Sequence, residues 1–436
     1  MGEIGGGAER LAPPLNNMRI AMLSVHTCPL AALGGKETGG MNVYVRDLSR
    51  ELGRRGVCVD VFTRCQDRAV SKVVALGEGA RVIHLDAGPC GPVPREEVFH
   101  YLPAFVAGVE AFARSEGVNY DVIHSHYWLS GWVGLRLRER WGIPVIQMFH
   151  TLARIKNRAL EGEREPELRV RAETRLLAEA DVIVAPTPVE RAELVWEFGT
   201  DPRRIAVIPC GVDLELFRAI PRPTALAEIG LGPGPLLLSV GRLTPIKGIE
   251  TLLRAFARLK DRPSPRLLIV GGGIDDPTNG EPARLRRLAS ELRADGRVEF
   301  LGALPQERLP FYYSAAEAVI MPSYYESFGM VALEAMACGS PVIASRVGGL
   351  AITVQDSVTG FLVPEGDPDA LAARIRALLV NPGLRERLGV AAKARAAGFR
   401  WSRIGRQVEG LYRRLTPSAL ETRWECRGVP EGSMRP

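Results

Sequence analysis

Lysine is scarce in this chain of 436 residues: six of its 56 basic residues are Lys, and the others are Arg. No apolar run approaches the roughly 20 residues that cross a bilayer, so we expect no transmembrane segment. The seven Cys are odd in number, scattered and without a CxxC pair. We therefore expect neither a disulfide framework nor a zinc site, and the reducing cytoplasm is the expected compartment.

The composition is that of a globular protein with sizeable cores, since 46% of the residues are apolar and 24% are charged. The length suits two domains of about 200 residues each. Arg and Lys exceed Asp and Glu only modestly, which gives a net charge of +6, and this excess is spread along the chain. A nucleic-acid-binding protein would show a denser basic stripe, so we expect no nucleic-acid partner.

Short β-branched runs alternate with amphipathic helical stretches along nearly the whole chain. Continuous apolar strands separated by helices predict parallel sheets covered on both faces, an α/β doubly wound architecture. The alternation pauses at residues 209–217, and we place the junction between two Rossmann-like domains there. Residues 1–17 and 416–436 lack periodicity and are expected to be disordered tails. Because ligands bind at the carboxyl ends of such strands, the cleft between the domains is the expected site.

Two loops are candidates for phosphate binding. Gly39 and Gly40 come directly before a predicted helix, where close backbone approach and free N–H groups favour an anion, although a plain tight turn gives the same pattern. Arg242 and Lys247 follow a predicted strand that ends at Gly241. Two such cations can clamp a diphosphate, Arg as a fork and Lys as a point charge; the alternative is a solvated loop.

The segment 322–334, PSYYESFGMVALE, carries two glutamates around the start of a predicted helix. The N–H groups of Phe328 to Val331 would form an anion-binding helix start. Glu334 lies in an apolar stretch, where an unpartnered charge is costly. Hydroxyl groups of a sugar or ribose are therefore the expected partners of Glu326 and Glu334; the alternative is that Glu326 caps the helix and Glu334 is exposed.

Together these motifs resemble the retaining glycosyltransferases of family 4, which have the GT-B fold, two Rossmann-like domains with parallel sheets facing a central cleft. The resemblance covers about residues 18–415. It implies an N-terminal acceptor-binding domain of residues 18–210 plus 399–415 and a C-terminal nucleotide-sugar-binding domain of residues 211–398. It also implies that the domains hinge around the donor and that the last helix, 401–415, crosses back. Members of the family are often homodimers.

The resemblance also assigns roles in the donor site, with a UDP-sugar as the expected co-substrate. Arg242 and Lys247 would hold the diphosphate and stabilise the charge of the leaving group. Glu334 would bind the ribose, and Glu326 the transferred sugar. His150 matches the family's histidine near the donor sugar, so the implied catalytic residues are His150, Arg242, Lys247 and Glu326. The other implied donor contacts are Gly40, Phe328, Gly329, Met330 and Val331.

The resemblance implies that no metal and no further cofactor are needed, because the two cations take the place of a divalent ion. A possible metal motif, Asp367-Pro368-Asp369, occurs in the chain. It comes directly before a predicted helix, so we expect Asp367 to be a helix cap.

Within the family, segments 39–45, 123–131 and 149–157 are most similar to the inositol 3-phosphate N-acetylglucosaminyltransferases of mycothiol synthesis. Bacterial sucrose-phosphate synthases are close relatives, and both enzymes accept a phosphorylated, hydroxyl-rich molecule. Arg95 and Phe149 differ from the residues of the mycothiol enzyme, which leaves inositol 3-phosphate and fructose 6-phosphate open as acceptors. The implied acceptor-binding residues are Asn42, Arg95, Tyr127, Thr151, Lys156 and Arg169. We expect packing roles for His124 and His126, and a mobile loop for Asn157 and residues 161–167.

The sequence therefore predicts a glycosyltransferase that moves GlcNAc or glucose to a polyol phosphate or sugar phosphate. An NAD(P)-linked oxidoreductase also uses Rossmann domains, but the chain has no clear GxGxxG fingerprint. A nucleotide-sugar-binding regulator without catalysis is a further alternative, against which His150, Glu326 and Lys247 argue. Titration with UDP-glucose, UDP-GlcNAc and NADH separates these classes.

Overall fold

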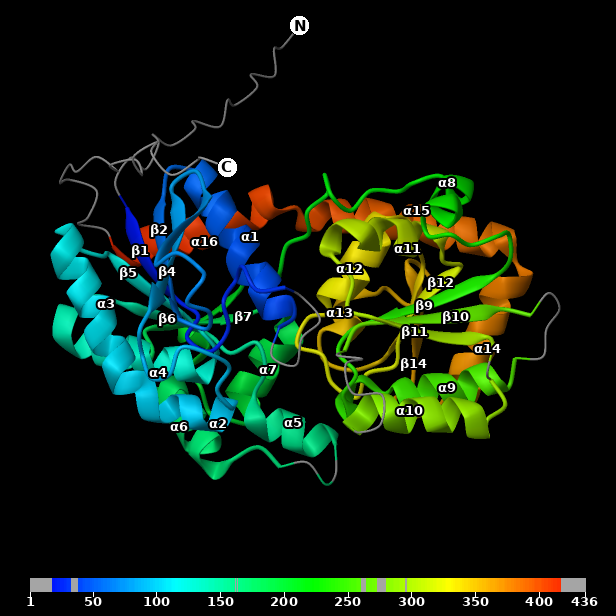
Figure 1. Ribbon diagram of the computed structural model, residues 1–436, viewed down its shortest axis with the longest axis horizontal. Helices are drawn as coiled ribbons and strands as arrows, with labels where there is room; N and C mark the ends of the chain where they lie inside the picture. The colour runs from blue at the N-terminus through cyan, green and yellow to red at the C-terminus, as the bar shows by residue number, and fades with distance from the viewer. Residues whose placement is uncertain are drawn as a thin grey trace, which may run out of the picture.

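The computed structural model consists of two α/β halves that lie side by side, each built on its own β-sheet (Figure 1). The described residues are 18–32, 38–160, 162, 164–259, 264–272, 280–294 and 296–416. The predicted tails at 1–17 and 416–436 lie outside these residues, apart from Thr416.

Within the described residues, the N-terminal half contains an eight-stranded sheet with the order β3-β4-β2-β1-β5-β6-β7-β8. Its strands are β1 (Arg19–Leu23), β2 (Cys58–Arg64), β3 (Val73–Gly77), β4 (Ala80–Leu85), β5 (Val122–His126), β6 (Val145–Met148), β7 (Val182–Ala185) and β8 (Ile205–Val207). The predicted parallel pairing holds for seven of the eight strands, and the edge strand β3 differs because it pairs antiparallel with β4. Only Glu78 and Gly79 connect these two strands, and so short a turn permits only antiparallel pairing.

Helices cover both faces of this sheet. Successive residues of a strand point to opposite faces, so neighbouring residues of one strand pack against different helices. In β1, Ile20 and Met22 pack with residues of α1 and α16, whereas Ala21 and Leu23 pack with residues of α3 and α4. Burial on both faces explains why the strands are continuously apolar in sequence. The helices of this half are α1 (Gly40–Arg54), α2 (Arg95–Val98), α3 (Leu102–Glu116), α4 (Tyr127–Trp141), α5 (Ala153–Ala159), α6 (Glu167–Glu179), α7 (Pro188–Trp196) and α16 (Trp401–Leu415).

The C-terminal half contains, in the same described part of the chain, a six-stranded parallel sheet with the order β11-β10-β9-β12-β13-β14. Its strands are β9 (Leu236–Val240), β10 (Arg266–Val270), β11 (Val298–Gly302), β12 (Ala318–Met321), β13 (Val342–Ser345) and β14 (Gly360–Val363). Its helices are α8 (Arg222–Glu228), α9 (Ile249–Ala257), α10 (Gly280–Glu291), α11 (Leu309–Ala315), α12 (Met330–Ala337), α13 (Leu350–Thr353), α14 (Pro368–Val380) and α15 (Pro382–Ala396). Asp367 caps α14, as predicted, and accepts hydrogen bonds from the backbone N–H groups of Asp369 and Ala370.

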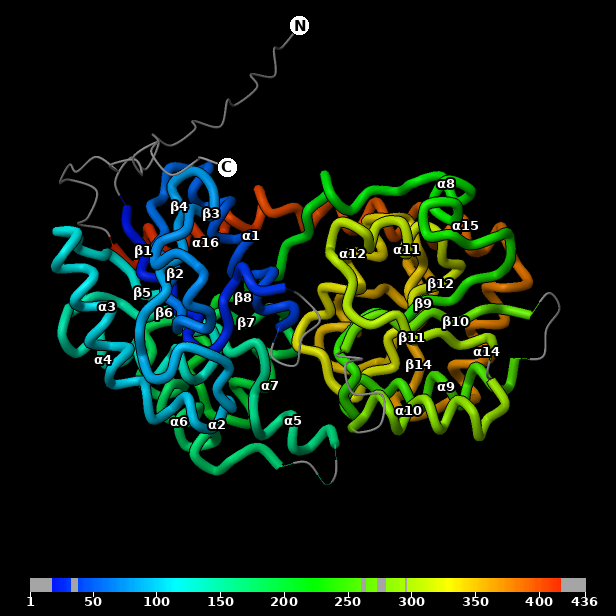
Figure 2. Tube along the Cα trace, viewed as in Figure 1, coloured from blue at the N-terminus to red at the C-terminus, as the bar shows by residue number. Residues whose placement is uncertain are grey.

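The chain passes between the halves twice, and the two connecting segments lie together. After α15 it returns to the N-terminal half, where α16 packs against α1 (Figure 2). The N–H group of Val212, in the first connection, donates to the carbonyl oxygen of Phe399, in the second, over 2.9 Å. An ion pair between Arg55, which directly follows α1, and Glu409 of α16 fixes the returning helix. The helix predicted at 401–415 is confirmed.

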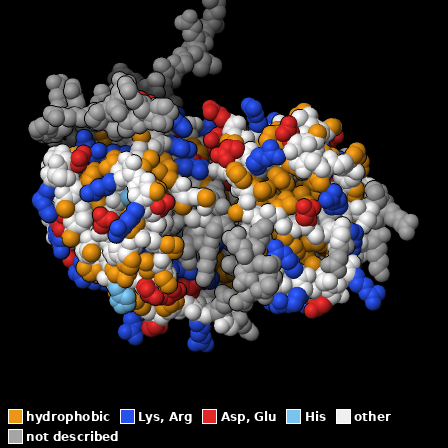
Figure 3. Space-filling model, in the orientation of Figure 1, with side chains coloured by type: hydrophobic (Ala, Val, Ile, Leu, Met, Phe, Trp, Pro, Cys, Tyr) orange, Lys and Arg blue, Asp and Glu red, His pale blue; other side chains and the backbone are white. Residues whose placement is uncertain are grey.

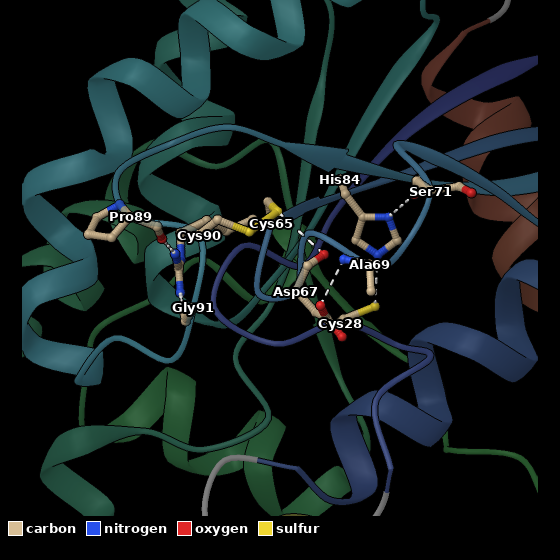
Figure 4. The surroundings of a disulfide bond; sticks show 10 residues. Cys28, Cys65, Asp67, Ala69, Ser71, His84, Pro89, Cys90 and Gly91 are labelled. Carbon is tan, nitrogen blue, oxygen red and sulfur yellow. Dashed lines mark hydrogen bonds between the residues drawn. A yellow bond between two sulfur atoms is a disulfide. The ribbon is translucent and has the colours of Figure 1, made fainter.

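The expectation of unpaired cysteines is wrong. Cys65 and Cys90 form a disulfide, with their Cα atoms 5.3 Å apart (Figure 4). Cys65 follows the carboxyl end of β2, and Cys90 follows the carboxyl end of β4. Because these two strands are paired, their ends bring the two cysteines together, which no local sequence motif predicts. Among the described residues, Cys28, Cys210 and Cys338 are free thiols. The cysteines therefore do not indicate a reducing compartment.

The surface shows basic and acidic side chains interspersed. On the face drawn in Figure 3, Arg and Lys side chains are spread over both halves rather than gathered into one stripe. Among the described residues, none of the helices combines the length and the apolar character required to span a bilayer.

Candidate active site

A cleft of about 480 Å³ lies between the two halves, and residues that follow the carboxyl ends of strands in both sheets line it. It brings together every residue that the sequence predicted for the site. From the N-terminal half these are Gly40, Asn42, Arg95, Tyr127, His150, Thr151, Lys156 and Arg169. From the C-terminal half they are Arg242, Lys247, Glu326, Phe328, Gly329, Met330, Val331 and Glu334.

The Gly39-Gly40 turn reaches across the cleft to the C-terminal half. A Cβ atom on Gly39 would lie 3.8 Å from Nε of Arg242, and one on Gly40 would lie 3.5 Å from the sulfur of Met330. Asn42 holds this turn in place, because its Oδ1 accepts a hydrogen bond of 2.9 Å from the N–H group of Gly39. Its amide group also donates to Oγ1 of Thr27, so the loop after β1 and the start of α1 are fastened together.

Lys247 and Glu326 meet at the carboxyl ends of neighbouring strands, β9 and β12, and form an ion pair in the cleft. The loops that carry them are in close contact. Gly248 has a φ of +65°, and a Cβ atom there would lie 2.0 Å from the carbonyl oxygen of Pro322, so only glycine permits this approach. The N–H group of Tyr324 donates to the carbonyl oxygen of Ile246 over 2.9 Å, which holds the two loops together.

The start of α12 faces the same cleft. Gly329, with a φ of +87°, precedes Met330, the first residue of the helix. A hydrogen bond of 2.8 Å from Oγ1 of Thr353 to the carbonyl oxygen of Phe328 fixes the turn. The first N–H groups of a helix have no partner within it and carry partial positive charge, so this turn can support a phosphate or a sugar hydroxyl.

Glu334 is buried within α12 and is held by polar side chains. The hydroxyl of Tyr313 donates to its Oε2 over 2.8 Å, and the amide of Gln306 donates to its Oε1 over 3.5 Å. Arg46, from α1 of the opposite half, donates to Oε1 of Gln306 over 2.6 Å. Burial raises the pKa of Glu334 to about 7, although the hydrogen bonds from Tyr313 and Gln306 act in the opposite direction.

His150 follows β6 and has a φ of +60°, which is unusual for a residue with a side chain. Its Nε2 lies 3.0 Å from Nδ1 of His126, so one of these two nitrogens donates to the other. Burial lowers the pKa of His150 to about 3, and the ring is therefore uncharged at neutral pH. His124 and His126 are buried as predicted, but the contact of His126 with His150 goes beyond packing.

The N-terminal side of the cleft contains three of the predicted cations. Arg169 is buried, and its guanidinium donates to Oε1 of Glu173 over 2.6 Å and to the carbonyl oxygen of Thr151 over 2.8 Å. It also lies over the ring of Tyr127, 4.8 Å from the centroid. Arg95 donates to the hydroxyl of Tyr127 over 3.2 Å. Lys156 lies on α5 and forms an ion pair with Glu165.

Several lining residues were not predicted, among them His26, Glu165 and Gln306. His26 lies three residues after the end of β1, so the rule that ligands bind at the carboxyl ends of strands could have found it. Burial lowers its pKa to about 3, and the charges of Arg95, Arg169 and Arg242 act in the same direction. Among the described residues, three or more His, Cys, Asp or Glu side chains are nowhere grouped so that they could hold a metal ion.

The chain matches two families that together cover most of its length. The family described as Glycosyltransferase Family 4 matches residues 38–216, and the one described as Glycosyl transferases group 1 matches residues 225–395. A protein of Nocardiopsis dassonvillei named D-inositol 3-phosphate glycosyltransferase is 43% identical over 96% of this chain and 99% of its own length. This chain is a family 4 glycosyltransferase. A second relative of that name, from Geodermatophilus obscurus, is 44% identical to this family 4 enzyme over 96% of the chain and 94% of the relative.

Solved structures agree with this family 4 assignment. Sucrose-phosphate synthase from Thermosynechococcus elongatus superposes with a TM-score of 0.85 and 40% identity, over 92% of this chain and 100% of that one. HepE from Anabaena in complex with UDP and glucose superposes with a TM-score of 0.74 at 21% identity, over 92% of this chain and 100% of that one, which shows the shared fold. The two facing α/β halves are thus the GT-B fold, and the predicted fold class is confirmed.

Proposed function

We propose that this enzyme transfers GlcNAc or glucose from a UDP-sugar to a phosphorylated polyol, inositol 3-phosphate foremost, with retention of the anomeric configuration. One observation carries the proposal: a single cleft has Arg242 and Lys247 on its C-terminal side and Arg95, Lys156 and Arg169 on its N-terminal side. Two separate groups of cations suit a diphosphate on one side and a phosphorylated acceptor on the other.

In the proposed donor site, residues 211–398 bind the nucleotide sugar. Arg242, Lys247 and the start of α12 stabilise the negative charge that grows on the diphosphate as the sugar leaves. Glu334 accepts hydrogen bonds from the ribose hydroxyls, and Glu326 accepts them from the transferred sugar. These charges make a divalent metal ion unnecessary, so activity should persist after treatment with a chelator.

In the proposed reaction, the bond between the anomeric carbon and the phosphate oxygen breaks. A hydroxyl group of the acceptor forms the new bond on the same face, and its proton passes to the leaving phosphate oxygen. The uncharged ring of His150 lies beside this position and hydrogen-bonds a sugar hydroxyl. Residues 18–210 and 399–415 bind the acceptor, whose phosphate contacts Arg95, Lys156 and Arg169, with Asn42, Tyr127 and Thr151 around it.

A second acceptor, fructose 6-phosphate, is favoured by the 40% identity to a sucrose-phosphate synthase over 92% of this chain. A matrix of UDP-, ADP- and GDP-sugars against inositol 3-phosphate, fructose 6-phosphate, inositol and free sugars tests the proposal. We expect the highest kcat/KM for a UDP-sugar with inositol 3-phosphate. Turnover only with unphosphorylated acceptors would contradict the proposed acceptor class, and binding of nucleotide sugars without any transfer would indicate a regulator.

A further inference from the structure

One carboxylate is already paired with two of the three cations on the N-terminal side of the cleft. Oε1 of Glu165 lies 2.5 Å from the ammonium nitrogen of Lys156, and Oε2 lies 2.8 Å from the guanidinium of Arg169. The Glu165 side chain is only 10% exposed and lines the cleft. A carboxylate that bridges two cations in this way has the same contacts that a phosphate group would make there.

The backbone holds Glu165 at this place. The prediction that Asn157 belongs to a loop is wrong, since it lies in α5 beside Lys156. Its Oδ1 accepts a hydrogen bond of 2.8 Å from the N–H group of Glu165. Glu165 thus comes from the connection between α5, which carries Lys156, and α6, which carries Arg169.

The two carboxylates near Arg169, those of Glu173 and Glu165, differ in their other partners. Glu173 pairs with Arg169 and also accepts a hydrogen bond of 2.8 Å from the N–H group of Ala153, so it supports the start of α5. Glu165 is the carboxylate that also neutralises Lys156. Although burial alone raises the pKa of Glu165, the charges of Arg169 and Lys156 lower it to about 2, so the group stays ionised and leaves the cations only if another anion replaces it.

We propose that Glu165 determines acceptor specificity by occupying the phosphate position on Lys156 and Arg169 until the phosphate of an acceptor displaces it. This inference rests on the proposed function, because it concerns the same acceptor site. A dianionic phosphate can replace one carboxylate between two cations. A hydroxyl group cannot, since it would leave Lys156 without a counter-charge and the buried Arg169 with only that of Glu173. Acceptors without a phosphate therefore meet a site that remains closed by Glu165.

Glu165→Gln tests this inference, because it keeps the size of the side chain and removes its charge. Inorganic phosphate, titrated by calorimetry at constant ionic strength, should bind the variant about tenfold more tightly, equivalent to about 1.4 kcal/mol. The KM for inositol 3-phosphate should fall in the same direction. Glu167→Gln is the matched control: it removes the same charge two residues away, from a side chain that is 69% exposed and pairs with Arg171.

The fold of the variant is checked by UDP binding, which uses the opposite side of the cleft and should be unchanged. In the opposite outcome, the variant binds UDP normally but binds phosphate no more tightly than the wild type does. Glu165 would then hold Lys156 and Arg169 in position instead of competing with phosphate for them, and the inference would be overturned. That result would leave the proposed function intact as long as inositol 3-phosphate is still glycosylated. If the wild type instead prefers unphosphorylated acceptors, the proposed function itself fails.

Discussion

Lys247 and Glu326 form an ion pair in the cleft between the two halves, although 79 positions separate them in the chain. The pair joins the loop after β9 to the loop before α12. It places a cation beside the helix start that faces the cleft, so the positive charge is available where a diphosphate would bind.

Removing this cation should reduce turnover. Lys247→Ala, and separately Arg242→Ala, should lower kcat by roughly 10²–10³, because each side chain stabilises charge on the leaving group. Steady-state kinetics with a UDP-sugar measure the effect. Lys72→Ala is the control, since Lys72 is exposed and does not line the cleft. A near-normal kcat in both cleft variants would show that the diphosphate does not bind there.

Donor binding should depend on pH through Glu334, because burial raises the pKa of that carboxyl to about 7. An ionised carboxylate accepts hydrogen bonds from both ribose hydroxyls, whereas a protonated one loses part of that capacity. The affinity for UDP should therefore increase as the pH rises from 6 to 8. Calorimetric titration of Glu334→Gln should give weaker binding without this rise. The same pH dependence in the variant would assign it to another group.

Tyr313→Phe provides a finer test of the same carboxyl group. The Tyr313 hydroxyl stabilises the ionised form of Glu334 through its hydrogen bond of 2.8 Å and so lowers the pKa. Its removal should move the midpoint of the pH dependence of UDP binding upward. A midpoint that stays constant while Glu334→Gln still abolishes the dependence would mean that Tyr313 has only a packing role.

Stability should fall with rising pH through Glu190, a buried residue of α7 that accepts a hydrogen bond of 2.7 Å from Ser327 of the opposite half. Burial raises the pKa of Glu190 from 4.5 to about 8. Between these values the folded protein holds a proton that the unfolded chain releases, so the free energy of unfolding decreases as the pH rises. Glu190→Gln removes this contribution. The Tm of the variant minus that of the wild type should increase between pH 5 and pH 8. A difference that stays constant with pH would show that Glu190 is not the group that titrates.

The disulfide should contribute to stability. The Cys65–Cys90 bond joins residues 25 positions apart, and cross-linking such a loop stabilises a protein by about 3 kcal/mol in the chain-entropy account. Denaturant unfolding of Cys90→Ser should show a loss of this order relative to the oxidised wild type. In the presence of a dithiol reductant the difference should largely disappear. A loss that persists under reducing conditions would indicate a packing effect of the substitution.

The C-terminal side of the cleft could be predicted from the sequence because its residues lie within short segments. Glu326, the start of α12 and Glu334 lie within nine consecutive residues, so they lie close together at one end of the helix whatever the rest of the fold. Arg242 and Lys247 follow a strand directly, and the carboxyl ends of parallel strands share one edge. The same local reasoning identified Asp367 as a helix cap.

The acceptor half depends on contacts between distant segments, which no local pattern reveals. His126 was expected only to pack, and it became a partner of His150 because β5 and β6 are neighbours in the sheet. Glu165 was predicted to lie in a mobile loop. The polar sequence around it does not reveal that its carboxylate pairs with two cations.

The sequence by itself determined the alternation of strands and helices, the two Rossmann-like domains and the loops that face the cleft, because hydrophobic periodicity and turn chemistry are local properties. Only the tertiary structure decided which side chains are paired across the fold. The Cys65–Cys90 bond, the hydrogen bond of Ser327 to Glu190 and the bridging carboxylate of Glu165 all depend on the order of strands in the sheets and on how the two halves face each other. Such pairs depend on how whole helices and strands pack, and the spacing of residues along the chain does not predict them.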